Sequence, residues 1–345
     1  MDNVLLAVRS LIIYKSAARI ALGILLCALC TLLLYRIRSG GKTPVLLLLF
    51  PAYALSLTFA RLLHWYFTAS AYSGFLQAVT DPYAGGFALP GVILGCWLSV
   101  WLLKVTGLIR NKNLLLDCLA PGLCLLVFCI RMSNGLTGTM LGNKNITLPV
   151  LQWEPLARRL TDAAGNIYYR LQVWLLEAVM MAILFVLCLV WLYRFRNRRM
   201  LRPCTKSGNV ARFFLLFFAF AEIITDSLRN DSVLMRFRFL HQLTPYSSFI
   251  SLAQVFAMAL LIAVFIYYLR CSAAIYGFDR GHGLSIGLFL LCGGLLGATG
   301  EFCIQRYGMK QFFLSVRAWG YLSMLAGCVG IAIIVLRLYD DCRKD

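Results

Sequence analysis

The amino-acid sequence predicts an all-α protein, a bundle of about nine helices that cross a membrane. Of its 345 residues, 61% are hydrophobic and only 14% are charged, whereas a soluble domain averages about 25% charged residues. Many apolar runs approach the roughly 20 residues that a spanning helix needs. The runs are continuous and do not alternate as barrel strands do, and only helices and closed barrels satisfy their backbone in hydrocarbon. These observations favour helices.

Nine spans are expected along the chain. They cover residues 17–35, 44–60, 86–103, 114–130, 171–193, 210–225, 249–269, 284–299 and 318–338. Basic clusters follow the odd-numbered spans, and the largest lies at residues 194–206. Because Lys and Arg accumulate in cytoplasmic loops, we expect an outside N-terminus and a cytoplasmic C-terminus. The longest outer segment, residues 134–170, is then a small extracytoplasmic head.

Composition also argues against several functional classes. The formal net charge is +19, but the basic residues lie between apolar runs. They therefore indicate how the chain is oriented in the membrane and that it attracts anionic lipid, and we expect no nucleic-acid partner. Most of the 13 cysteines lie inside apolar runs. The cysteines and the three histidines form no metal-ligand spacing and no Ser/His/Asp pattern. We expect no metal and no cofactor.

One polar segment follows the fourth span directly and is a candidate site. It contains Arg131, Asn134, Gly138 and Gly142. A charge near the hydrocarbon boundary is costly and is usually functional. Arginine can bind a phosphate bidentately, and glycines allow close approach of the backbone. The alternative is an arginine that extends to the lipid headgroups above a glycine turn.

A second polar cluster lies at the outer end of the sixth span. Glu222 and Asp226 are four residues apart, and Arg229 follows three residues later, so the three side chains lie on neighbouring helix positions. An ion-pair network that ends the helix explains the cluster. The alternative is a second phosphate-directed arginine that the acids hold in place, and this segment by itself favours the ion-pair network. In the functional interpretation, Arg131 and Arg229 converge on one headgroup cavity open to the outer leaflet.

Single polar residues in or near other spans complete the set. His64 lies one turn after Arg61 at an outer face, and Tyr14 precedes the first span. An isolated histidine or tyrosine at such a place is more often an interfacial anchor than a catalytic group. Glu177 lies inside the fifth span, and we expect it to face the interior of the bundle.

In their order and spacing, these residues resemble the prolipoprotein diacylglyceryl transferase family of bacterial inner membranes. The resemblance covers about 250 residues and extends from Tyr14 to about Leu269. It rests on Tyr14, on Arg61 and Leu62, on Gly91 and Gly95, on Asp117, Ala120 and Pro121, on Arg131, Asn134, Gly138 and Gly142, on Asp226, Leu228, Arg229, Asp231 and Ser232, and on Ser251 and Gln254.

The resemblance implies a function and a set of partners. Residues 1–270 would form the transferase-like membrane domain, and residues 271–345 an additional helical pair. The reaction would move the diacylglyceryl group of phosphatidylglycerol to the cysteine thiol of a lipobox in the inner (plasma) membrane. The partners would be phosphatidylglycerol, a prolipoprotein signal peptide and membrane lipids. The catalytic residues would be Arg131, Arg229 and His64, and the substrate-binding residues Tyr14, Arg61, Asn134, Gly138, Gly142 and Asp226.

The chain also departs from the family pattern. Pro90 stands where the family has a histidine just before the glycines of the third span, and Thr139 stands at a glutamate position. Residues 167–173 read I-Y-Y-R-L-Q-V and lack a second family histidine. Two other functions therefore stay open. One is an inactive relative that binds anionic phospholipid or lipoprotein signal peptides, and the other is a small-solute permease.

Overall fold

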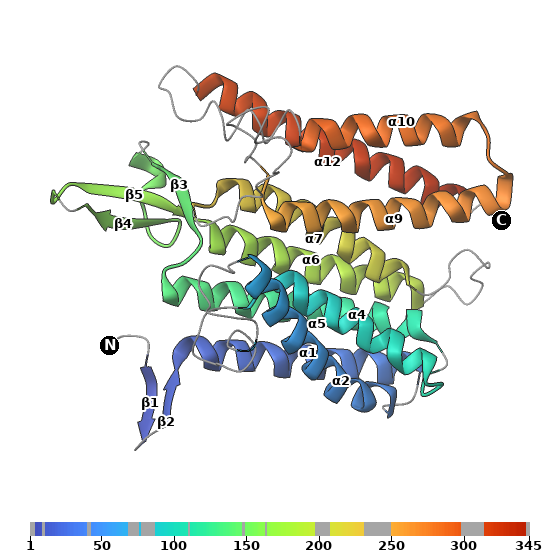
Figure 1. Ribbon diagram of the computed structural model, residues 1–345, viewed down its shortest axis with the longest axis horizontal. Coiled ribbons are helices and arrows are strands. Elements are labelled where there is room, and N and C mark those ends of the chain that lie inside the picture. The colour runs from blue at the N-terminus through green and yellow to red at the C-terminus, as the bar shows by residue number, and fades with distance from the viewer. Residues whose placement is uncertain are drawn as a thin grey trace. The chain divides into compact units, whose positions relative to one another are not determined.

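A computed structural model describes residues 4–8, 11–39, 43–67, 76, 87–109, 111–146, 149–162, 164–196, 208–230, 250–297 and 314–342. Within these residues it contains nine helices, each overlapping one expected span, so the all-α fold is confirmed (Figure 1). They are α1 (Lys15–Ser39), α2 (Thr43–Phe67), α4 (Leu89–Val105), α5 (Lys112–Thr137), α6 (Val173–Arg196), α7 (Asn209–Leu228), α9 (Leu252–Tyr276), α10 (Arg280–Gly294) and α12 (Leu314–Asp341).

The helices have the length and surface of a multi-pass membrane protein. In the described part of the chain, seven are long and apolar enough to span a bilayer, and α4 is a shorter apolar helix. Large apolar side chains such as Phe50, Ile183 and Leu290 are more than half exposed, and a bilayer is the solvent that such surfaces need. Helix α7 differs because its 20 residues include Arg212, Glu222 and Asp226.

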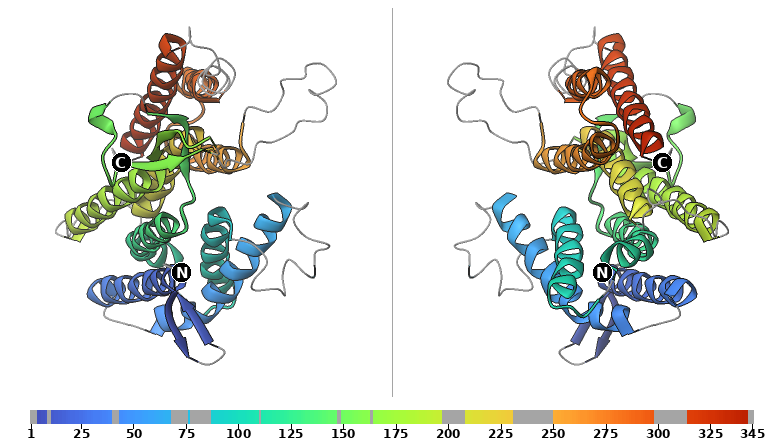
Figure 2. Two further views of the ribbon diagram at one scale, coloured as in Figure 1. Left: turned by 90° about the vertical axis from the view of Figure 1, so that its left-hand side faces the viewer. Right: turned by 90° about the vertical axis from the view of Figure 1, so that its right-hand side faces the viewer.

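The chain forms two compact units. The first comprises Met1–Arg199 with Ser207–Phe214, and the second comprises Met200–Lys206 with Leu215–Asp345. In the first unit α5 packs against α1, α4 and α6, and α2 packs against α4; the nearly end-on views of Figure 2 show these neighbours. In the second unit α12 packs against α9 and α10. The division expected at residue 270 rests on the family resemblance and stays a prediction.

Small residues let helices α2 and α4 approach closely. A Cβ atom at Gly91 would collide with the backbone of Ala60, and one at Gly95 with the backbone of Ser56. The Ser56 hydroxyl donates to the carbonyl oxygen of Val92 across the same contact, at 3.1 Å. In lipid the hydrophobic effect does not hold helices together, so close packing at small residues and hydrogen bonds between helices stabilise the contact instead. This contact fixes Arg61 and His64, which lie on α2 just beyond it.

The segment expected as a small head contains a three-stranded antiparallel sheet. Its strands are β3 (Leu141–Asn145), β4 (Ala157–Thr161) and β5 (Ile167–Gln172), in the order β3-β5-β4, and the short 3₁₀ helix η2 (Pro149–Leu151) connects β3 to β4. A hairpin of β1 (Val4–Val8) and β2 (Leu11–Tyr14) precedes α1. The sheet starts three residues after α5 and ends where α6 begins, so it covers the ends of both helices.

Candidate functional site

The first part of the site is a buried ion pair between α5 and α6. The Nε and Nη2 atoms of Arg131 both lie 2.6 Å from Oε1 of Glu177. Arg131 is 5% exposed and Glu177 is 1% exposed. The expectation that Glu177 faces the bundle interior is confirmed. A buried charge pair of this kind fixes the direction of the guanidinium, because charge-assisted hydrogen bonds are short and directional.

A methionine receives the remaining donors of this cluster. Nη1 of Arg131 lies 3.4 Å from the sulfur of Met140, and Nδ2 of Asn134 lies 2.9 Å from the same sulfur. Met140 is 1% exposed and has a φ angle of 60°. A non-glycine residue in this left-handed region is uncommon and marks strain, which collects at functional sites. The structure thus directs Arg131 and Asn134 at one sulfur atom, and their roles in catalysis and substrate binding stay predictions.

Glycine is needed at two positions of this segment for different structural reasons. Gly138 ends α5 with a φ angle of 71°, and a Cβ atom there would collide with the guanidinium of Arg158. Gly142 is buried in β3, where a Cβ atom would lie 3.1 Å from Cβ of Leu171. Arg158 extends from β4, so the sheet places a second arginine beside the end of α5. The sequence analysis did not select Arg158.

The start of α1 lies beside the same part of α5. Nη1 of Arg19 donates to the carbonyl oxygen of Met132 at 2.7 Å, and the Ser133 hydroxyl donates to the carbonyl oxygen of Ser16 at 3.0 Å. Lys15 and Arg19 line a cavity of about 310 Å³ here. Two cations at the end of an apolar helix suit an anionic lipid headgroup. Of Tyr14, which precedes Lys15, the structure describes the backbone at the end of β2.

Arg61 and His64 form another group on α2. Arg61 is 4% exposed, and its guanidinium lies 4.8 Å from the centre of the Phe87 ring. A cation over an aromatic face is attracted by the ring quadrupole, more strongly where water is excluded. His64 is half-buried one turn later.

The acidic cluster lies in the second compact unit, at the end of α7. Nη1 of Arg229 lies 3.3 Å from Oδ1 of Asp226, and Glu222 is buried on the same helix. Ser251 and Gln254 cap the start of α9 reciprocally, and Nε2 of Gln254 donates to the carbonyl oxygen of Ile223 at 3.2 Å. Arg131 belongs to the first unit, so its convergence with Arg229 stays a prediction.

A comparison with protein families decides the identity of the chain. The model of the prolipoprotein diacylglyceryl transferase family matches residues 3–270, well over half of the chain. The chain belongs to this family. A comparison with curated proteins finds no match. A prolipoprotein diacylglyceryl transferase is a membrane-embedded transferase of lipoprotein biosynthesis, which agrees with the apolar helices described above. The additional helices α10 and α12 lie beyond the matched residues.

Another residue of the transferase resemblance has a structural role. Asp117 of α5 is 2% exposed, and its carboxylate accepts the backbone N–H groups of Gly208 at 2.6 Å and of Ala211 at 3.0 Å. The first N–H groups of a helix have no partner within it, and an anion there is favourable. Asp117 therefore caps α7 from a different helix, and we assign it to folding rather than to chemistry.

Met140 and Arg158 are the site residues that sequence reasoning missed in this transferase. Nothing in the sequence marks Met140, because its role depends on a left-handed backbone. The ion pair of Arg131 with Glu177, in contrast, could have been predicted from the sequence. An arginine and a glutamate in two successive apolar spans each need a partner, and each is the simplest partner for the other.

Proposed function

We propose that this protein transfers the diacylglyceryl group of phosphatidylglycerol to the thiol of a lipobox cysteine. The observation that carries the proposal is the pair of donors aimed at Met140: Arg131 and Asn134 both direct an N–H group at its sulfur. A thioether sulfur is a weak acceptor. A phosphate oxygen at this place would form charge-assisted hydrogen bonds that are about twice as strong as neutral ones.

The ion pair with Glu177 prepares Arg131 for this role. Nε and Nη2 are occupied by the glutamate, which leaves Nη1 as the part of the guanidinium directed at the site. A cation held in a fixed place stabilises charge that develops in a transition state without reorganisation. Arg158, Lys15 and Arg19 add positive charge around the same end of α5 and attract an anionic lipid.

The reaction needs a nucleophile and a leaving group. The cysteine thiol loses its proton to a base, and its sulfur attacks the glycerol carbon that carries the phosphate. A C–S bond forms, the C–O bond breaks, and glycerol phosphate leaves with the electron pair. We propose that Arg131 and Arg229 balance the charge of the leaving phosphate. Tyr14, Arg61, Asn134, Gly138, Gly142 and Asp226 complete the substrate-binding set. His64 is the proposed base, with Glu222 or Asp226 as the alternative.

The proposal places the site at the outer face of the cell's inner membrane. It needs an N-terminus outside, a C-terminus in the cytoplasm and nine spans, as the basic clusters indicate. Reporter fusions at Arg199 and at Lys344 should both give a cytoplasmic signal. An extracytoplasmic signal at Arg199 contradicts this topology and moves Arg131 to the wrong leaflet.

The direct test is lipidation by the purified full-length protein. Vesicles with phosphatidylglycerol labelled in its acyl chains are mixed with a lipobox peptide, and a peptide with serine in place of the cysteine is the control. We expect label on the cysteine peptide alone. The absent family histidines at Pro90 and residues 167–173 favour a non-catalytic relative as the second candidate. Binding of phosphatidylglycerol vesicles without any transfer would favour that candidate.

A further inference from the structure

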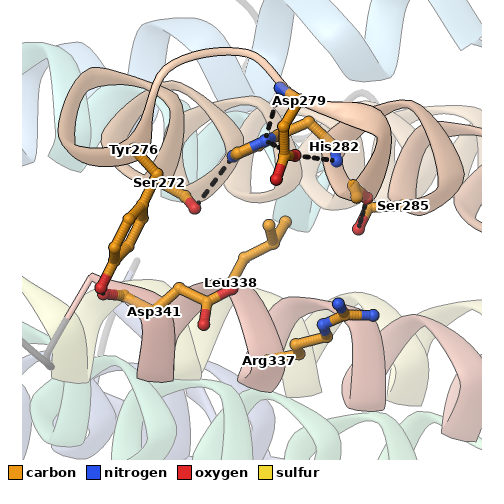
Figure 3. Close-up of a pocket in the computed structure, with 9 residues that line it drawn as sticks. Ser272, Tyr276, Asp279, His282, Ser285, Arg337, Leu338 and Asp341 are labelled. Atoms are coloured by element: carbon orange, nitrogen blue, oxygen red, sulfur yellow. Dashed lines mark hydrogen bonds and ion pairs between the residues drawn. The ribbon is translucent and has the colours of Figure 1, made fainter.

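A serine, a histidine and an aspartate form a hydrogen-bonded chain in the second unit, outside the matched family region. Nδ1 of His282 lies 2.5 Å from Oδ1 of Asp279, and Nε2 of His282 lies 3.0 Å from Oγ of Ser272 (Figure 3). Ser272 is on α9, one turn before its end, Asp279 is in the connection, and His282 is in the first turn of α10. The sequence shows no Ser/His/Asp pattern, because the contact joins residues of two different helices.

The short distance to Asp279 decides the direction of the hydrogen bonds. Nδ1 of His282 lies 2.5 Å from Oδ1 of Asp279 and 3.3 Å from the backbone nitrogen of the same residue. Because the contact with the carboxylate is the shorter one, we assign the proton to Nδ1, which then donates to the carboxylate and does not accept the backbone N–H. The His282 backbone N–H, together with the ring donor, holds the pKa of Asp279 below its usual value, which keeps the carboxylate charged. Nε2 is then free of a proton and accepts the hydroxyl hydrogen of Ser272. This is the arrangement that activates a serine nucleophile.

Helix capping accounts for only half of this chain. The Asp279 carboxylate accepts the backbone N–H of His282 at 2.9 Å and so caps the start of α10, which is a structural role. Capping does not require Ser272, which lies on a different helix. The Ser272 and His282 side chains are buried, with exposed fractions of 1% and 5%.

All three residues border a cavity of about 340 Å³ between α9, α10 and α12. Tyr276, Ser285 and Arg337 contribute to the same wall. Figure 3 shows Arg337 on α12, on the opposite side of the cavity from the Ser272–His282 contact. The volume falls within the range of small-molecule sites, roughly 300–1,000 Å³. Arg337 and Asp341 of α12 contribute a guanidinium and a carboxylate to this side of the cavity, and the guanidinium can bind an anionic group of a substrate.

We propose that Ser272, His282 and Asp279 form a second catalytic site, which hydrolyses an acyl ester of an anionic phospholipid. The site does not depend on the proposed transferase activity, since its residues belong to α9, α10 and their connection. The junction lies between two apolar helices, both long enough to span a bilayer. The acyl esters of a phospholipid lie near the membrane surface, at the level where such helices end, and Arg337 suits a phosphate.

The reaction proceeds in two balanced steps. The Ser272 oxygen attacks the ester carbonyl carbon while its proton moves to Nε2 of His282. The C–O bond of the ester breaks, and the leaving alcohol takes the proton from His282, which leaves an acyl group on Ser272. Water then attacks the acyl carbon and gives its proton to His282. The fatty acid leaves and the serine recovers its proton.

A fluorophosphonate probe tests the nucleophile in the full-length protein. Such a probe reacts with serines activated by a base, and mass spectrometry locates the label. We expect the label on Ser272, and an at least tenfold slower reaction in His282→Gln. Ser323→Ala is the matched control, because Ser323 of α12 is in the same unit and its hydroxyl donates to the backbone carbonyl of Leu295 at 3.0 Å. This control should react like the wild-type protein.

A second assay identifies the substrate and keeps the proposal testable if a variant folds poorly. Wild-type protein is mixed with vesicles of phosphatidylglycerol or of phosphatidylcholine, and released fatty acid is measured. Faster release from the anionic vesicles, reduced in Arg337→Gln, supports the proposal. A wild-type protein that takes no probe on Ser272, or that releases no fatty acid from either vesicle, overturns it. Retained lipobox lipidation in that case would leave the transferase assignment intact.

Discussion

The ion pair between Arg131 and Glu177 gives the most informative prediction. In Glu177→Gln the carboxylate is lost, and the guanidinium of Arg131, 5% exposed, keeps a charge without its anion. Removal of one partner from a buried ion pair costs about 3–5 kcal/mol of folding free energy. Arg131→Ala leaves Glu177 in the equivalent position and should cost a similar amount. Thermal unfolding in detergent micelles, followed by circular dichroism, measures both losses.

A double variant separates folding from chemistry. Replacement of both partners of a buried ion pair by apolar residues of similar volume is often neutral or stabilising. We therefore expect Arg131→Met combined with Glu177→Leu to regain most of the thermal stability. It should still transfer no diacylglyceryl group, because the phosphate-directed cation is absent. Arg159→Ala, on the exposed part of β4, is the control and should change stability by less than about 0.5 kcal/mol.

The result that refutes this reasoning is a double variant with wild-type lipidation. It would show that the pair only holds α5 against α6 and that Arg131 has no part in phosphate binding. Single variants with unchanged unfolding temperatures would refute the energetic argument as well, since they would show that water reaches the pair.

Three further predictions follow from the same unit. Gly138→Ala should lower stability more than Gly107→Ala. Both glycines have positive φ angles, so both variants carry left-handed strain of about 1–2 kcal/mol, but only at Gly138 would the new Cβ atom also collide with Arg158. Thermal unfolding measures the difference between the two variants. Asp117→Asn keeps one acceptor oxygen for two backbone N–H groups and should cost about 1–3 kcal/mol in the same assay. His64→Ala should slow lipidation strongly at pH 6 and little at pH 9, where a cysteine with a pKa near ~8.5 is mostly thiolate.

Each of these predictions can fail in a specific way. Equal losses at the two glycines would show that the guanidinium of Arg158 moves aside at no cost. An Asp117→Asn protein as stable as the wild type would show that water replaces the lost acceptor. A lipidation rate that is flat from pH 6 to pH 9 and unaffected by His64→Ala would point to a different base.

Hydropathy was sufficient to predict the helices, because each span must be apolar over its whole length. Even α7 was found, although its three charged residues make it less apolar than its neighbours. The strands of the head were not predicted. Its β4 strand reads Ala-Arg-Arg-Leu-Thr, which has no clear alternation, and the strand forms because β5 pairs with it on one side. The sequence of one segment alone does not predict that it will pair with another segment of the chain.

The sequence indicated candidate site residues, but it did not indicate the contacts that those residues make in the structure. Arg131 and Asn134 were selected because charge at the edge of an apolar span is costly, and that argument needs no structure. The sulfur of Met140 as their shared partner depends on one left-handed φ angle. The contact of Ser272 with His282 likewise depends on how α9 turns back into α10. Sequence spacing gives the distance between residues along one helix, whereas these contacts join different elements.

We propose His64 as a replacement for the histidine that the family resemblance places at Pro90, and its position in the structure supports this proposal. Pro90 lies in the first turn of α4, where a missing N–H group is tolerated. The N–H group of Ala88, just before this turn, donates to the carbonyl oxygen of Ala60 on α2 at 3.1 Å. His64 lies four residues after Ala60, on the same face of α2. As the proposed base, His64 on α2 would serve the junction that a histidine at the start of α4 would serve, and the pH dependence of His64→Ala tests this proposal directly.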